Sequence, residues 1–228
     1  LTKFTQIRIN GPIAKFNSST PGSCLNNAIV FTDSSKSDGI NPIQTYFWDY
    51  GDSTTQTIAA GPFQHTYYKA GLYPVKLITD TLGCIDSYSL PTPLVISKPA
   101  ANFNTTDTVS CPTKPVTFNN TSTGPNLTYF WKFGDSSTST LQNPVHLYNV
   151  EGLYPVSLFI TDQYGCTDSI VKQNYVTIKL PFANFKMSDS LSDCPPLIVQ
   201  FTDLSKNAIS KIWDFGDGTS TAEDNPSH

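Results

Sequence analysis

The chain has 228 residues and a formal net charge of -4, with 14 Lys and Arg against 18 Asp and Glu. Only one of the basic residues is Arg, which argues against nucleic acid as a partner, because phosphates are bound by clustered basic side chains. No apolar run reaches the about 20 residues that a membrane-spanning helix needs. The length suits two or three domains of about 100 residues.

Short strands joined by turns are predicted along the whole chain, because Ser, Thr, Asn, Pro and Gly are abundant and apolar residues do not recur at helical spacing. The opening segment "LTKFTQIRIN" is predicted to be a strand rather than a signal peptide. Its end, "TQIRINGP", matches two later segments, "PLVISKP" and "YVTIKLP". We therefore expect it to be the last strand of a preceding repeat in a larger protein.

The next elements form one complete repeat. It opens with "PIAKF" at Pro12 and continues through Cys24 to the predicted strand "AIVFTD". The segment "FWDYGDST" follows at Phe47, and His65 comes after it. The later strand "YPVKLIT" places Tyr, Val, Leu and Thr on one face and Pro, Lys and Ile on the other.

The same order recurs with near-copies of the tryptophan segment, "FWKFGDSS" and "IWDFGDGT", whose tryptophans lie 83 and 82 residues apart. A feature repeated at domain-sized spacing belongs to each module. The predicted organisation is a last strand of a preceding module (1–11), module 1 (12–98), module 2 (99–180) and the first half of module 3 (181–228).

About seven short alternating strands fit each period, with turn sequences such as "SDG" and "TGPN" between them. This pattern predicts an all-β fold of tandem immunoglobulin-like sandwiches. The order of the motifs in "WDFGDGTSTAEDNPSH" (213–228) and "WKFGDSS…NPVHLYNVEGLYPV" (131–156) resembles the PKD (polycystic kidney disease) domain. The resemblance implies two packed sheets per module, tandem arrangement and an extracellular location. Lys132 and the segment "GPFQH" depart from the family pattern.

Each position of the tryptophan segment has a structural interpretation. We expect the Trp to fill the module core, the Gly to end the strand in a tight turn, and the Asp to accept hydrogen bonds from backbone N–H groups of that turn. The residues concerned are Trp48, Gly51 and Asp52, then Trp131, Gly134 and Asp135, then Trp213, Gly216 and Asp217.

The same carboxylates suggest a metal alternative, with Asp214 and Asp217 as a weak candidate site for Ca²⁺, which prefers oxygen ligands. The chain has no "DxDxDG" loop, and Lys132 replaces one of the acidic residues in module 2. The structural interpretation is therefore favoured, and no other cofactor is expected.

The five cysteines suggest a disulfide framework. One cysteine of each module precedes the second strand, and the other follows the sixth in "TDTLGC" or "TDQYGC". We predict the bonds Cys24–Cys84 and Cys111–Cys166 at one end of each sandwich, with the partner of Cys194 missing from the chain. Such bonds need an oxidising compartment. Free thiols or a zinc site are the alternatives, and zinc is disfavoured without a CxxC pair.

Catalysis is not predicted. His65, His146 and His228 occupy one equivalent position per module, so they are expected to support the turn after the Trp strand, because a catalytic triad is defined by geometry and not by inventory. Paired carboxylates such as Asp214 and Asp217 belong to the same turn.

A short motif of Asp, then Ser or Thr, then an aliphatic residue or Thr resembles the O-glycosylation sequon of Bacteroidota, although Asp-Ser and Asp-Thr also simply favour turns. The "TDxxGC" variant likewise resembles repeats of large Bacteroidota surface and gliding-adhesin-like proteins, which use type IX secretion. The five candidate acceptors are Ser53, Thr81, Thr108, Ser169 and Ser190.

Two functions are consistent with these features. The first is a rigid stalk or filament for adhesion or display, in which Pro99 and Pro181 stiffen the junctions. Its expected partners are neighbouring modules of the same chain, other copies of the chain where it self-assembles into fibres, and surface glycans or polysaccharide. The alternative is a carbohydrate- or protein-binding accessory region of a secreted hydrolase. Exposed tyrosines such as Tyr67, Tyr68 and Tyr148 would stack on sugars in that case, although packing at the sandwich edge is the more common role.

Overall fold

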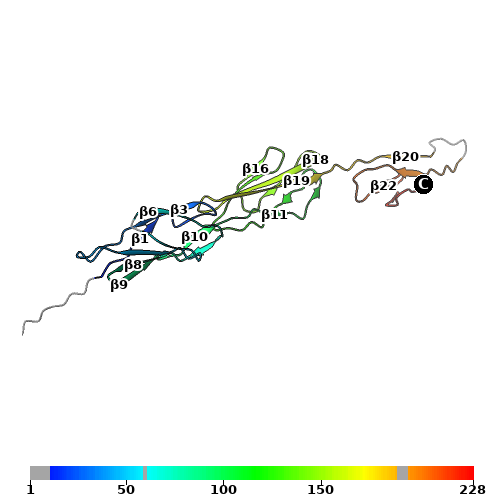
Figure 1. The fold of residues 1–228 in the computed structure, drawn as a ribbon. Coiled ribbons are helices and arrows are strands. Elements are labelled where there is room, and N and C mark those ends of the chain that lie inside the picture. Colours follow the sequence, from blue (N-terminus) through cyan, green and yellow to red (C-terminus); the bar gives the residue numbers. More distant parts are fainter. Residues whose placement is uncertain (1–10, 59–60, 189–194) are drawn as a thin grey trace, which may run out of the picture. The chain divides into compact units, whose positions relative to one another are not determined.

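The computed structural model describes residues 11–58, 61–188 and 195–228, and its elements are all β-strands (Figure 1). By packing, the chain divides into two compact units. Unit 1 comprises the described residues up to Asn102 together with Thr121–Tyr129 and Phe159–Ser169, and unit 2 comprises Phe103–Asn120, Phe130–Leu158 and Ile170–His228. Two segments of the second repeat thus pack with the first.

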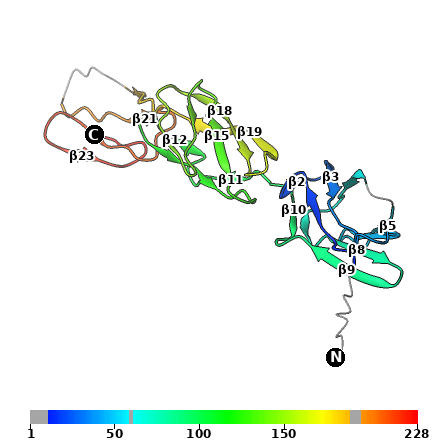
Figure 2. The same ribbon diagram turned by 90° about the vertical axis from the view of Figure 1, so that its left-hand side faces the viewer.

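Three small sheets build the first repeat, in the orders β1-β3-β6, β5-β4-β8-β9 and β2-β10-β7. All pairs are antiparallel except β2 with β10, which is parallel. Figure 2 shows β8 and β9 as a hairpin. The strands are β1 (Phe16–Ser18), β2 (Gly22–Cys24), β3 (Ala28–Asp33), β4 (Thr45–Asp49), β5 (Thr55–Thr57), β6 (Pro62–Thr66), β7 (Gly71–Tyr73), β8 (Lys76–Thr81), β9 (Cys84–Ser89) and β10 (Leu94–Ser97).

Strand alternation buries the face that the sequence predicts. Tyr73, Val75, Leu77 and Thr79 are buried, whereas Ile78 is half-buried. β8 pairs with β4 so that Leu77 lies opposite Trp48. The ring of Trp48 packs edge-on against Phe16, with centroids 4.9 Å apart, at the centre of the core. Burying an aromatic ring of this size removes about 200 Å² from water, which makes the Trp a main contributor to a small core.

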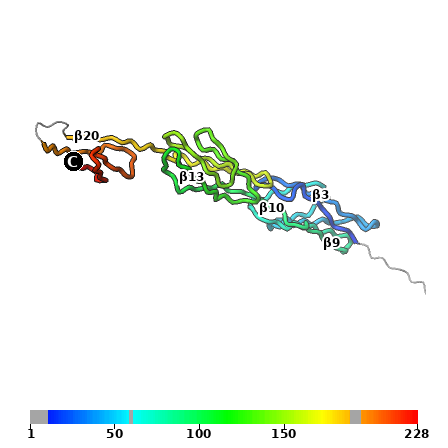
Figure 3. Tube along the Cα trace, turned by 180° about the vertical axis from the view of Figure 1, so that it is seen from behind, coloured from blue at the N-terminus to red at the C-terminus, as the bar shows by residue number. Residues whose placement is uncertain are grey.

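The second repeat follows the first along the chain (Figure 3, green to yellow), and it has two long strands, β18 and β19, whereas six of its other strands have only two residues each. Its main sheet has the order β12-β19-β18-β15-β16, and β11-β14 and β13-β17 are two-stranded. Trp131 is buried here with Phe103 5.1 Å away. The strands are β11 (Phe103–Asn104), β12 (Val109–Ser110), β13 (Val116–Thr117), β14 (Asn119–Asn120), β15 (Thr128–Lys132), β16 (Thr138–Ser139), β17 (Val145–His146), β18 (Gly152–Thr161) and β19 (Thr167–Ile178).

The last segment contains two strand pairs, β20 (Phe185–Met187) with β21 (Phe201–Asp203) and β22 (Trp213–Asp214) with β23 (Ser220–Thr221). Trp213 packs 5.4 Å from Phe185, as its counterparts do, but it is only half-buried. Within the described part of 181–228, no strand corresponds to β8, the strand that pairs with the Trp strand in module 1. The assignment of 181–228 as the first half of a module stays a prediction.

Candidate functional site

The turn after each Trp strand joins a carboxylate, a histidine and an aromatic ring. In module 1 Asp52 accepts hydrogen bonds from the backbone N–H of Thr54 (3.0 Å) and contacts Nε2 of His65 (2.8 Å). The imidazole of His65 stacks on Tyr50, with ring centroids 3.9 Å apart and planes 4° from parallel. Tyr67 then donates its hydroxyl proton to the carbonyl of Tyr50 (3.0 Å). The histidine therefore connects the turn to the core.

The same arrangement recurs in the other repeats. Nε2 of His146 lies 2.7 Å from Asp135, and its ring stacks on Phe133 at 4.3 Å. Nε2 of His228 lies 2.9 Å from Asp217, and its ring stacks on Phe215 with centroids 4.1 Å apart. The glycine of each turn has positive φ: 79° at Gly51, 89° at Gly134 and 81° at Gly216. In the first two modules a Cβ on this glycine would also lie within 3 Å of a proline, Pro74 for Gly51 and Pro155 for Gly134.

Hydrogen bonds in this turn stabilise the ionised carboxylates. The side-chain hydroxyl and backbone N–H of Thr219, together with His228, lower the pKa of Asp217 to about 2. At Asp135, burial raises the pKa, but hydrogen bonds from Ser137 and His146 outweigh this and leave it below its usual value. The negative charge is therefore favoured in the folded turn.

This arrangement lacks the geometry of a catalytic triad. Nε2 of His146 contacts both Asp135 and the hydroxyl of Ser137 (3.1 Å), and that hydroxyl itself donates to Asp135. A triad needs the carboxylate on one ring nitrogen and the nucleophile on the other. Here one nitrogen serves both, so no base is positioned to activate the serine.

The calcium candidates are engaged in the same turn. Asp214 accepts the N–H of Gly216 (2.9 Å), and Asp217 accepts from Thr219 and contacts His228. Across the described ranges, no three His, Cys, Asp or Glu side chains form a group suited to a metal. At the position equivalent to Asp214, module 2 carries Lys132. The calcium site stays a prediction.

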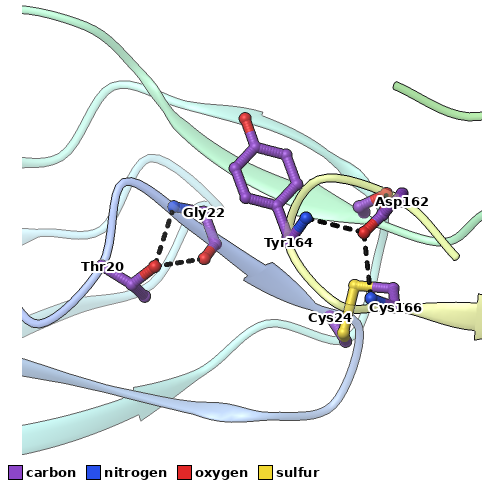
Figure 4. The surroundings of a disulfide bond; sticks show 7 residues. Thr20, Gly22, Cys24, Asp162, Tyr164 and Cys166 are labelled. Carbon is purple, nitrogen blue, oxygen red and sulfur yellow. Dashed lines mark hydrogen bonds between the residues drawn. A yellow bond between two sulfur atoms is a disulfide. The ribbon is translucent and has the colours of Figure 1, made fainter. Parts of the chain in front are cut away.

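The disulfide prediction is wrong in its pairing. The structure bonds Cys24 to Cys166, with Cα atoms 5.3 Å apart (Figure 4). Cys84 and Cys111 are exposed and free. The bond therefore links module 1 to the β18–β19 turn of module 2, and both of its cysteines lie in unit 1. Cys194 lies outside the described residues.

Strand length explains the error. Cys166 immediately precedes β19, and Cys111 follows β12, which pairs with the far end of β19 through Ser110 opposite Ile178. Twelve residues of extended strand span about 40 Å at about 3.3 Å per residue, while bonded cysteines need Cα atoms within about 7 Å. The prediction had placed both cysteines of a module at one end of the sandwich.

The bond lies in a polar and aromatic junction that sequence reasoning missed. Asp162 is buried and accepts from the hydroxyl of Ser97 and from the backbone N–H groups of Tyr164 (2.8 Å) and Cys166 (2.9 Å). The ring of Tyr164 lies against β2, where a Cβ on Gly22 would be 2.4 Å from a ring carbon (Figure 4). The glycine therefore makes room for the ring.

The candidate glycosylation residues differ in accessibility. Ser53, Thr108 and Ser169 are exposed. Thr81 is only 2% exposed and its hydroxyl is buried without a hydrogen-bond partner, so the prediction of an acceptor there is wrong for the folded chain. Strand β8 points this threonine inward. Ser190 lies outside the described residues.

The candidate stacking tyrosines are mostly internal. Tyr67 and Tyr148 are fully buried. Their hydroxyls donate hydrogen bonds to the carbonyls of Tyr50 and Phe133, the residues on which the histidines stack. Only Tyr68 of the three is open to solvent, at 80% exposure. The sugar-stacking interpretation of the two buried tyrosines is therefore wrong.

The ionised turn carboxylate gives a pH-dependent prediction. Because the folded-state pKa of Asp135 is lowered, its stabilisation is present above the unfolded-state value of about 3.9 and is lost as the pH falls through the folded-state value. Asp135→Asn should lower the free energy of unfolding by about 1 kcal/mol at neutral pH, measured by urea titration. The deficit should shrink below about pH 4. Asp107→Asn, at a surface ion pair, is the control, and a deficit independent of pH would contradict this account.

The Gly22–Tyr164 contact gives a second prediction. Gly22→Ala should displace the ring and lower the free energy of unfolding by about 1–2 kcal/mol, as overpacking does. Gly61→Ala is the matched control, since a Cβ there meets nothing within 4 Å. Adding Tyr164→Ala to the first variant should remove most of the difference between the two glycine substitutions. Equal effects of both glycine substitutions in urea titrations would refute the contact.

Comparison with known proteins identifies a shared domain. The chain is 51% identical over 49 residues to a microbial collagenase of Vibrio alginolyticus and 41% identical over 56 residues to collagenase ColA of Bacillus cereus, matches that cover 20% and 25% of this chain. The matched segments span only 6% of each collagenase. No helix among the described residues is long and apolar enough to cross a membrane.

Solved structures to which this chain is similar include the PKD1 domain of Vibrio anguillarum Epp, at 29% identity and TM-score 0.31, covering 36% of this chain and 98% of that domain. Three N-terminal domains of the bacteriophage RB49 capsid protein Hoc align at 12% identity and TM-score 0.44, covering 96% of this chain and 80% of theirs. The PKD domain model matches residues 10–90 and 96–178, well over half of the chain. The chain therefore belongs to the PKD domain family and carries two such domains in tandem.

Proposed function

We propose that the chain is a non-catalytic repeat region of a large extracellular surface protein, acting as a stalk or filament for adhesion or display. The observation that carries this proposal is the Cys24–Cys166 bond, which fastens the end of β2 in one PKD domain to the β18–β19 turn of the next. Ser97 and Asp162 add a buried hydrogen bond beside it. A covalent bond between successive domains serves a mechanical connection and has no role in a catalytic site.

Three features support an extracellular location. A disulfide persists in oxidising compartments. PKD domains occur here in tandem, and the curated relatives are named as collagenases. Within this proposal, the parent is a Bacteroidota adhesin-like protein exported by type IX secretion, and Ser53, Thr108 and Ser169 are its exposed candidates for O-glycosylation.

The alternative function is an accessory binding region of a secreted hydrolase, and the similarity to collagenases favours it. Its ligand would be a protein fibre or polysaccharide. A binding face usually needs several exposed aromatic residues, and burial of Tyr67 and Tyr148 leaves Tyr68 as the exposed one of the proposed set. The stalk is therefore the proposal we prefer.

Small-angle scattering of the intact chain tests the stalk. With Cys24–Cys166 intact, one narrow distribution of interatomic distances is expected, because the bond limits movement of the second domain against the first. The double variant Cys24→Ser/Cys166→Ser should broaden that distribution, and Cys84→Ser, at a free thiol, should leave it unchanged. A scattering profile of freely tumbling domains in the oxidised wild type would contradict the proposal.

Co-sedimentation separates the two functions. When the oxidised chain is mixed with insoluble collagen or cellulose and centrifuged, the stalk proposal expects the chain to remain in the supernatant. Pelleting that Tyr68→Ala abolishes would instead support the binding function.

A further inference from the structure

Two cysteines have no role in the junction just described. Cys84 and Cys111 are exposed free thiols. Each is nevertheless the repeat counterpart of a bonded cysteine. Cys111 precedes Phe118 by the same seven residues that separate Cys24 from Phe31, and Cys84 ends "TDTLGC" as Cys166 ends "TDQYGC". The free pair therefore corresponds to the two halves of the observed bond.

Strand register confirms the first correspondence. In module 1, Cys24 lies opposite Ser97 in the parallel pair β2–β10, where the chain leaves the domain. In module 2 the parallel pair β12–β19 places Ser110 opposite Ile178, and the N–H of Lys179 donates to Ser110 (3.0 Å). Cys111, the next residue, thus stands where the chain leaves the second domain, as Cys24 does in the first.

The second correspondence rests on the segment that enters each domain. Asp168, two residues after Cys166, accepts the N–H of Ala101 (2.7 Å). Asp86, two residues after Cys84, accepts the N–H of Ala14 in the same way (2.8 Å). A Cβ on Gly11 would lie 3.7 Å from that of Cys84, so the entering chain passes this thiol. Cys84 therefore faces the side from which a preceding domain would connect.

We propose that these PKD domains are joined by a repeating disulfide. In each link the first cysteine of one domain, equivalent to Cys24, bonds to the hairpin cysteine of the next domain, equivalent to Cys166. Cys24–Cys166 is one such link. Cys84 bonds to the first cysteine of a preceding PKD domain, and Cys111 bonds to the hairpin cysteine of the domain to which 181–228 belongs. Cys194, outside the described residues, is the first cysteine of that domain. This inference rests on the proposed tandem array.

The chemistry of each link is thiol–disulfide exchange. One thiolate attacks an oxidant disulfide, carried by an oxidoreductase or by oxidised glutathione, and forms a mixed disulfide with release of one oxidant thiolate. The thiolate of the partner domain then displaces the second oxidant sulfur. Two domain thiols lose two protons and two electrons in total, and the oxidant disulfide becomes two thiols. In this scheme no disulfide joins two cysteines of the same domain, and every disulfide connects consecutive domains.

Peptide mapping of the parent protein tests this inference. The protein is released from its source without reductant, alkylated, and digested with trypsin and chymotrypsin before and after reduction. We expect Cys84 in a cross-linked peptide with a cysteine seven residues ahead of a domain Phe, and Cys111 with a Gly-Cys peptide of the following domain. The Cys24–Cys166 peptide is the internal control.

The outcomes separate this inference from the proposed function. Alkylation of Cys84 and Cys111 before reduction, in a parent whose sequence has PKD domains on both sides, would overturn the repeating link and leave the array intact. A bond of either thiol within its own domain would overturn it equally. A parent without neighbouring PKD domains would overturn both the tandem array and the link that rests on it.

Discussion

The extended length of a β-strand determines how these domains are connected. In module 2, Cys166 lies at the start of β19, and Cys111 follows β12, which pairs with the end of the same strand. The two cysteines are therefore a full strand apart and cannot bond to each other. The hairpin of one domain lies instead beside the exit of the domain before it, where Cys166 bonds Cys24. In other sandwiches a disulfide can connect two strands of the same domain, whereas this one joins consecutive domains. The stalk proposal follows from that connectivity.

The turn that recurs in each repeat has a structural role within its own domain. Asp52 holds the turn and His65, and the imidazole lies on Tyr50, whose carbonyl is bonded by Tyr67. These contacts run from an exposed loop to the buried core. Repetition of this unit at His146 and His228 shows that it comes with the fold, which is why neither a metal nor a catalytic function is needed to explain it.

Much of this was predictable from sequence, because it depends on local patterns. Strand alternation identified the buried face through Val75 and Leu77, and turn chemistry identified the role of Asp52. The cysteine pairing was not predictable in the same way, since it depends on which ends of two strands meet. Sequence favoured packing over sugar stacking for the tyrosines, but it did not tell which ring of the Tyr67–Tyr68 pair points inward.

The most direct test of this account is disulfide mapping of the 228-residue chain itself, alkylated under native, non-reducing conditions. The account predicts one cross-linked peptide pair containing Cys24 and Cys166, with Cys84 and Cys111 alkylated before reduction. Recovery of Cys24 bonded to Cys84, or of Cys111 bonded to Cys166, would show that each domain is closed on itself and would contradict the account.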